Sequence, residues 1–197
     1  MSPLPALSAV LADPTPAADG ALAQALALLF EPSPVLADVL APQLARTLPG
    51  AVRTYSDLVD AALALLRTWD PALQAQFVGG HPRIGEVQHL SALSAREQAA
   101  AATPPAVLAR LAHLNACYER RFPGLRYITF VNGRSREQVM REMEDVLGFL
   151  RSLSADEPPV ESVAQVDVGG PVWRGEAQRA VEDVGKIAKA RLKALGA

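Results

Sequence analysis

The stretch PPAVLARLAHLNACYERRF, residues 104–122, decides the fold class. Its side chains Leu108, Leu111, Asn115, Tyr118 and Phe122 recur at intervals of three and four residues. That period places them on one face of an α-helix, with a single amide among apolar groups. A helix is therefore predicted over residues 104–121.

The same helical preference extends in both directions along the chain. Aromatic residues make up 5% of the sequence, alanine is abundant and β-branched residues rarely cluster, so local propensities favour helix over strand. Ser33-Pro34, Asp70-Pro71 and Thr103-Pro104 each place a capping side chain before a proline suited to the first helical turn. We predict an all-α, single-domain helical bundle of about eight helices, at residues 21–30, 34–47, 54–69, 71–78, 95–102, 104–121, 136–152 and 174–195.

Three segments lie outside this helical pattern. Residues 1–20 contain four prolines and are expected to form a loose N-terminal lead-in with room for one short helix, so that residues 21–197 make up the domain. Tyr127–Val131 looks extended but is too short to seed a sheet, so we expect a buried crossing segment. Ser154–Gly170, which has paired prolines and paired glycines, is expected to be a surface loop.

Composition excludes several classes of protein. The net charge of -2 provides no bulk positive field for nucleic acid, so no nucleic-acid partner is expected. The single cysteine, Cys117, cannot form an internal disulfide, and no zinc-ligand spacing occurs. The longest apolar stretch, Ala25–Phe30, is too short to span a membrane, and no basic residue precedes Arg46 as a targeting signal would require. A soluble intracellular protein is expected.

His81 is the first candidate for chemistry. It follows Gly79-Gly80 and precedes Pro82, which places an imidazole on a rigid turn at the end of a helix. An imidazole titrates near neutral pH and can transfer protons in both directions. The alternative is a structural loop histidine whose cation is favoured by the helix dipole.

Two possible helix starts could also bind an anion. Ser94 and Glu97 have the spacing of a capping box, followed by Gln98, and Ser135 and Gln138 form a second box. Helix initiation explains both boxes, although the free N–H groups of a first turn also favour an anionic ligand.

Arg191 is unusual by its position in the last predicted helix. It lies at the edge of the apolar stripe that includes Ala188 and Leu192. A partly buried guanidinium needs a carboxylate or an anionic ligand, and the alternative is a side chain that extends to water. The chain has no metal-binding His pair at helical spacing, no Walker loop, no nucleophile elbow and no dinucleotide fingerprint. We therefore expect chemistry performed by side chains, without a metal or an organic cofactor.

Four strings, in this order, resemble one enzyme family. GGHPRIGE, SALSAREQ, LNACYERRFPGLRYITFVNGRSREQVMREME and IAKARL are similar to the 2-oxo-4-hydroxy-4-carboxy-5-ureidoimidazoline (OHCU) decarboxylases of urate breakdown. The FPGLRY text makes the chain most similar to the fungal-type branch. The resemblance runs from about Leu28 to Leu195.

The resemblance implies a set of functional residues. His81 would be the catalytic acid/base and Glu97 its catalytic partner, which would orient the imidazole or the substrate hydroxyl. The substrate-binding residues that it implies come from the HP motif, the SxxEQ string, the backbone before the GRS string and the last helix. These are Pro82, Ser94, Gln98, Thr129, Phe130, Val131, Asn132, Gly133 and Arg191.

The resemblance also implies an activity and partners. The expected reaction is cofactor-independent decarboxylation of a small ureidoimidazoline to (S)-allantoin by a homodimer. Because the sequence ends in Leu195-Gly196-Ala197 and not in a peroxisomal tripeptide, the cytoplasm is the expected location. The alternative is a non-catalytic helical module for ligand binding or dimerisation that retains the fold.

Overall fold

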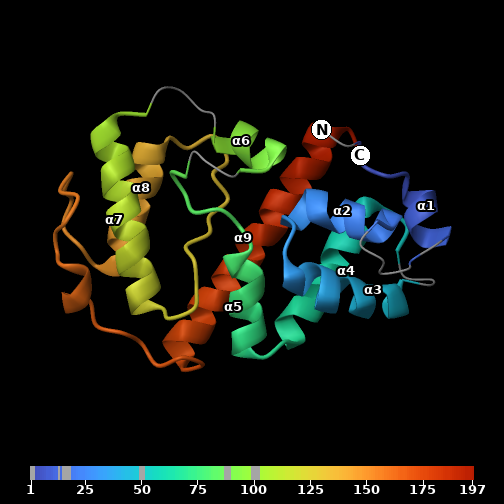
Figure 1. The fold of residues 1–197 in the computed structure, drawn as a ribbon, viewed down its shortest axis with the longest axis horizontal. Helices are drawn as coiled ribbons and strands as arrows, with labels where there is room; N and C mark the ends of the chain where they lie inside the picture. The colour runs from blue at the N-terminus through green and yellow to red at the C-terminus, as the bar shows by residue number, and fades with distance from the viewer. Residues whose placement is uncertain (1–2, 13, 15–18, 49–51, 87–89, 99–102) are drawn as a thin grey trace.

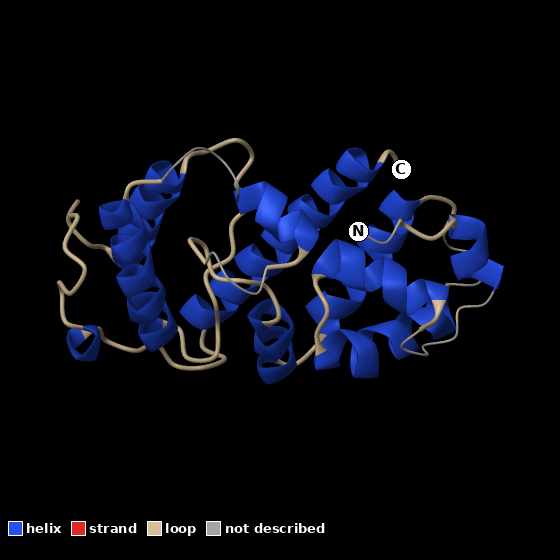
Figure 2. Ribbon diagram, turned by 45° about the horizontal axis from the view of Figure 1, so that its top comes forward, coloured by secondary structure: helices blue, strands red, loops and turns tan. Residues whose placement is uncertain are grey.

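The computed structural model describes residues 3–12, 14, 19–48, 52–86, 90–98 and 103–197, with only the backbone described for 96–98. Within these residues it contains helices and loops and no strand, which confirms the all-α prediction (Figure 2). The α-helices of this part of the chain are α1 (Leu7–Ala12), α2 (Ala21–Phe30), α3 (Ala41–Thr47), α4 (Tyr55–Thr68), α5 (Pro71–Gly79), α6 (Ala92–Gln98), α7 (Pro105–Arg121), α8 (Arg136–Leu147) and α9 (Pro171–Leu195). A π-helical turn, Leu36–Leu40, leads into α3, and a 3-10 turn occupies Val160–Ser162.

Side-chain caps fix several helix starts where the sequence predicted them. Asp70 accepts a hydrogen bond from the Leu73 amide at 3.0 Å at the start of α5. The predicted box at Ser135 and Gln138 starts α8. Helix α8 ends at Leu147 and not at the expected residue 152, because Gly148 adopts a left-handed conformation with φ 73°. The predicted cap at Thr103 is wrong, because α7 begins at Pro105 after Pro104 and has no side-chain cap hydrogen bond. Helices α2 and α9 also begin without one.

Helix α9 connects two hydrophobic cores. In Figure 1 it runs diagonally between the group that contains α7 and α8 and the group that contains α1–α4. Its first turns place Trp173 in the core of α7 and α8, and its later turns place Val184 in the core of α2–α4. At Gly185 a Cβ atom would lie 2.5 Å from Leu63 Cδ1, so the glycine permits close packing of α9 on α4. One helix thus fixes the two groups relative to each other.

The segment between α7 and α8 crosses from one core to the other. Tyr127 belongs to the core of α7 and α8, whereas Ile128 belongs to the core of α2–α4. Residues 127–131 form no sheet, as expected, but only Tyr127 and Ile128 are buried and residues 129–131 are half-buried. The crossing segment therefore lies where the two cores meet.

The predicted surface loop after α8 is held by a buried ion pair. Arg110 and Glu144 are 1% and 0% exposed, with 2.9 Å between Nη2 and Oε1. The Arg110 guanidinium also donates to the Ser154 carbonyl at 3.0 Å. The loop is irregular apart from the 3-10 turn, and it is anchored from inside the bundle.

The expected short helix of the lead-in is α1. Its Val10 is fully buried in the core of α2–α4, and the Tyr55 hydroxyl donates to the Pro5 carbonyl at 2.6 Å. No described helix combines the length and the apolar character that crossing a membrane requires.

Candidate functional site

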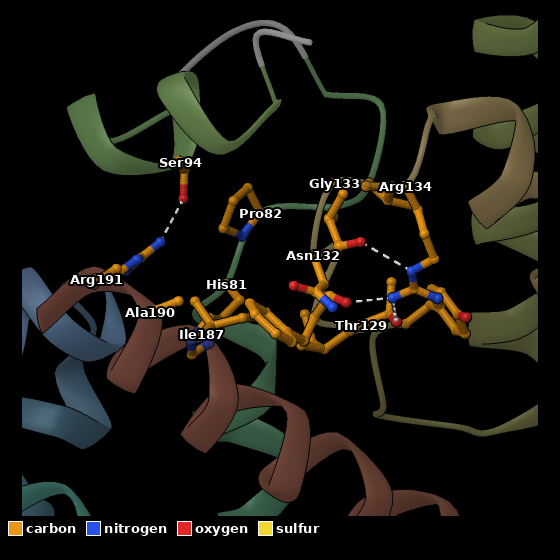
Figure 3. A pocket seen from close by; sticks show the side chains of 15 residues that line it. His81, Pro82, Ser94, Thr129, Asn132, Gly133, Arg134, Ile187, Ala190 and Arg191 are labelled. Atoms are coloured by element: carbon orange, nitrogen blue, oxygen red, sulfur yellow. Dashed lines mark hydrogen bonds between the residues drawn. The ribbon is translucent and has the colours of Figure 1, made fainter. Parts of the chain in front are cut away.

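A cavity of about 220 Å³ lies beside the crossing segment and the later turns of α9. Figure 3 shows Ser94 and Arg191 toward one side, Thr129 and Arg134 toward the other, and His81 between them. The cavity is lined by His81, Pro82, Ile84, Ser94, Tyr127, Ile128, Thr129, Phe130, Val131, Asn132, Gly133, Arg134, Ile187, Ala190 and Arg191. A space of this size suits a small ring compound.

His81 stands on the turn that ends α5. Its backbone amide donates to the Val78 carbonyl at 3.1 Å, and its ring packs edge-on against Phe77 with 5.8 Å between ring centroids. The side chain is 2% exposed, and neither ring nitrogen has a hydrogen-bond partner in the described part of the chain. Buried polar atoms without partners are rare in folded proteins. The imidazole therefore has unused hydrogen-bonding capacity, and His81 lines the cavity.

The electrostatic surroundings of His81 keep its ring neutral. Burial, followed by the positive charge of Arg191, lowers the pKa of His81 from 6.5 to about 4, and Glu31 opposes this shift. The ring is therefore uncharged at neutral pH and can accept a proton there. Burial of the ring disfavours the cation that the helix end would otherwise stabilise.

Arg191 is buried at 2% exposure, and its partners lie at the end of α2 and on α6. Nη2 donates to Glu31 Oε1 at 2.6 Å and to Ser94 Oγ at 2.9 Å. The guanidinium therefore reaches a carboxylate, as its position in the sequence requires, and does not extend to water.

The far wall of the cavity is backbone held by side-chain contacts. Arg134 Nη2 donates to Thr129 Oγ1 at 2.9 Å, and its Nε donates to the Val131 carbonyl at 2.9 Å. The Phe130 amide donates to Asp183 Oδ2 on α9 at 3.3 Å. These contacts give the crossing segment a fixed position against the cavity.

The turn that follows has an unusual backbone. Asn132 and Gly133 have positive φ values of 47° and 79°. Asparagine and glycine tolerate this conformation better than other residues do. The NG pair therefore permits the turn that brings the wall into α8.

The structure brings most of the sequence-predicted site residues to this one cavity. The predicted residues that line it are His81, Pro82, Ser94, Thr129, Phe130, Val131, Asn132, Gly133 and Arg191. The side chains of Glu97 and Gln98 lie outside the described residues, although their backbone belongs to the last turn of α6.

The predicted helix start at Ser94 is wrong. Helix α6 begins at Ala92, and Ser91 caps it by accepting from the Ser94 amide at 3.1 Å. Both serines have the chemistry of a cap, and the chain uses the earlier one. Ser94 therefore lies inside the helix. Its hydroxyl accepts a hydrogen bond from Arg191 and not from a backbone amide of the first helical turn, as a cap would.

Sequence reasoning missed Glu31 and Arg134. Glu31 directly follows the apolar run Ala25–Phe30, and a lone carboxylate at the end of such a run is a signal of a buried partner. Arg134 follows the NG turn, but nothing in its spacing indicates that it folds back onto Val131. The part of the chain that the structure describes contains no group of three or more His, Cys, Asp or Glu side chains that could hold a metal ion.

Comparison with known proteins gives one result. The family model described as OHCU decarboxylase matches residues 16–150. Searches of curated proteins and of solved structures give no match. His81, Ser94 and the crossing segment lie inside the matched range, and Arg191 lies beyond it. Because the match covers more than half of the 197 residues, the chain belongs to the OHCU decarboxylase family.

Proposed function

We propose that the protein decarboxylates OHCU to (S)-allantoin, with His81 as the acid/base and no cofactor. Membership of the family supports a decarboxylase of urate degradation. The observation that carries the finer proposal is a buried, neutral imidazole without a hydrogen-bond partner among the described residues, in the same small cavity as a buried guanidinium.

The substrate can absorb the electrons of the reaction by itself. OHCU is a five-membered ring with a hydroxyl and a carboxylate on one carbon, beside a conjugated imine. When the bond to the carboxylate carbon breaks, its electron pair moves into the imine, whose nitrogen takes a proton. The hydroxyl carbon becomes a carbonyl as its proton leaves, and the neighbouring ring carbon receives a proton on one face. One proton from solvent balances the lost carboxylate charge, so no additional electron sink is needed.

His81 is suited to the proton transfers in this sequence. As a neutral imidazole it takes the hydroxyl proton, and as the resulting cation it can return a proton to the ring carbon. Positioned acid/base catalysis of this kind contributes about 10²- to 10⁴-fold in rate. The buried position of the ring, 2% exposed, also restricts water from delivering protons to the wrong face.

The other cavity residues would bind and orient the ring. In this proposal Arg191 and Ser94 anchor carboxylate or ureido oxygens, and the backbone of Thr129–Gly133 contacts the flat ring. Glu97 would orient His81 or the substrate hydroxyl, and Gln98 would bind substrate. A guanidinium that holds the departing carboxylate tightly stabilises the ground state, so Arg191 contributes to binding more than to the chemical step.

The experiment uses OHCU made in place from urate by the two upstream enzymes. The protein is added, and circular dichroism follows the appearance of optically active allantoin. Faster formation of the (S) enantiomer than in buffer supports the proposal. Formation at the spontaneous rate, with racemic product, contradicts it and favours a non-catalytic helical module.

A further inference from the structure

The strongest feature outside the cavity lining is Glu31, at the C-terminal end of α2. It adopts a positive φ of 65°, and among the described residues only Asn132 shares this property without being glycine. A residue other than glycine is strained in this conformation unless the surroundings hold it. The turn directs the carboxylate inward, where Glu31 is 4% exposed. The strained backbone conformation of Glu31 therefore places its carboxylate in the interior.

One oxygen of Glu31 joins three donors. Oε1 accepts from Ser94 Oγ at 2.5 Å, from Arg191 Nη2 at 2.6 Å and from Ser91 Oγ at 2.8 Å. Ser94 and Arg191 line the cavity, whereas Glu31 does not. The carboxylate thus lies directly behind two groups that face the cavity.

The end of α2 completes the anchor of Arg191. Nη1 donates to the carbonyls of Leu28 and Leu29, each at 3.3 Å. Carbonyls in the last turn of a helix lack intrahelical partners and carry the negative end of the helix dipole. The C-terminal end of α2 therefore holds the guanidinium.

Glu31 is charged in this position. Burial would raise the pKa of Glu31, but the Arg191 guanidinium and the hydrogen bonds from Ser94 and Ser91 together bring it below its ordinary value. At neutral pH the carboxylate and the guanidinium form a neutral buried pair. Any anion that enters the cavity meets a guanidinium whose charge is already largely compensated.

We propose that Glu31 is a positioning residue that fixes Arg191 and Ser94 and limits how strongly the cavity holds an anion. The inference rests on the proposed function, because the substrate carboxylate leaves as CO2 in that reaction. A cavity that binds an anion only moderately holds this carboxylate in place without stabilising it too strongly. Glu31 acts through Arg191 and does not itself touch the substrate. The negative charge of Glu31 and the hydrogen bonds that its side chain accepts therefore have effects on anion binding that substitutions can separate.

Binding of two stable ureido compounds separates these effects. Allantoate carries a carboxylate and allantoin is neutral, and isothermal titration calorimetry measures both on the full chain. Glu31→Gln keeps the shape and removes the charge, so we expect allantoate to bind on the order of tenfold tighter, with allantoin changed less than twofold. Glu31→Ala removes the anchor as well, so both compounds should bind more weakly. If Glu31→Gln turns over OHCU, both KM and kcat should be lower than in the wild type, because the substrate carboxylate is bound more tightly before it leaves.

A matched control comes from the other buried ion pair. Glu144 is fully buried beside Arg110 and lies outside the cavity lining, so Glu144→Gln should lower stability without changing the affinity for either compound. If Glu31→Gln does not fold alone, both compounds should restore its helical circular dichroism, and the concentration of allantoate needed, relative to that of allantoin, should be about tenfold lower than the wild-type affinities predict.

Several results would overturn the inference. Equal shifts for the two compounds in Glu31→Gln, or the same allantoate shift in Glu144→Gln, contradict it while leaving the proposed function intact. Rescue of folding at the concentration ratio that the wild-type affinities predict, or rescue by neither compound, also contradicts it. A wild-type protein that binds neither compound rejects the inference, whereas turnover of OHCU decides the proposed function separately.

Discussion

Replacing His81 by asparagine should remove a defined part of the pH dependence of stability. In the unfolded chain the imidazole titrates near 6.5, whereas burial and the nearby Arg191 guanidinium lower the pKa of His81 to about 4 in the folded protein. Between these two values the unfolded state binds a proton that the folded state does not bind. Lowering the pH through this window therefore favours unfolding, and above it His81 has no effect.

The size of this effect follows from linkage. The full gap corresponds to about 3 kcal/mol, of which about 2 kcal/mol is lost between pH 7 and pH 5. Urea unfolding, followed by far-ultraviolet circular dichroism at the two pH values, measures the loss for the wild type and for His81→Asn. Other groups titrate in both proteins and cancel in the comparison. The wild type should lose about 2 kcal/mol more than the variant. Equal losses in the two proteins would show that His81 is not held neutral in the fold.

Three further substitutions test other parts of the site and fold. Arg191→Met should raise KM at least tenfold, with a smaller change in kcat, because the guanidinium binds more than it accelerates; steady-state kinetics that show the opposite split would reject the anchoring role. Arg110→Met leaves the buried Glu144 carboxylate with only the exposed Arg151 guanidinium, 3.6 Å away, so urea unfolding should show a loss of about 3 kcal/mol. A loss below 1 kcal/mol would contradict the importance of that pair. Ser91→Ala removes the cap of α6 and should cost about 1 kcal/mol, with faster amide exchange at Ser94; unchanged exchange would place the helix start elsewhere.

Local patterns in the sequence predicted the helices well. The apolar stripe of residues 104–122 and the cap at Ser135 depend only on residues close to them in the sequence. The helices that they form can therefore be predicted without knowledge of the fold. The start of α6 was misplaced because Ser91 and Ser94 both have cap chemistry, and tertiary contacts decide between them. The end of α8 was placed too late, at residue 152, because the left-handed Gly148 ends the helix at Leu147.

The cavity was predictable only in part. His81 and Arg191 stand out in the sequence, and the family resemblance supplies Ser94 and the wall residues. For Arg191 the sequence left three possibilities open, namely a carboxylate partner, an anionic ligand or a side chain that extends to water. The identity of the carboxylate partner could not be predicted, because Glu31 lies 160 residues away along the chain. Pairings at such separations depend on how α2 and α9 pack, which no local pattern encodes.

The most direct test of the central claim is single-turnover decarboxylation of OHCU by His81→Asn. Affinity for allantoin, measured on the same preparation, reports whether the cavity remains intact. We expect the variant to bind allantoin about as tightly as the wild type does, with the rate of (S)-allantoin formation reduced by at least about 10²-fold. A variant that binds allantoin and forms (S)-allantoin at the wild-type rate would show that this imidazole does not transfer the proton.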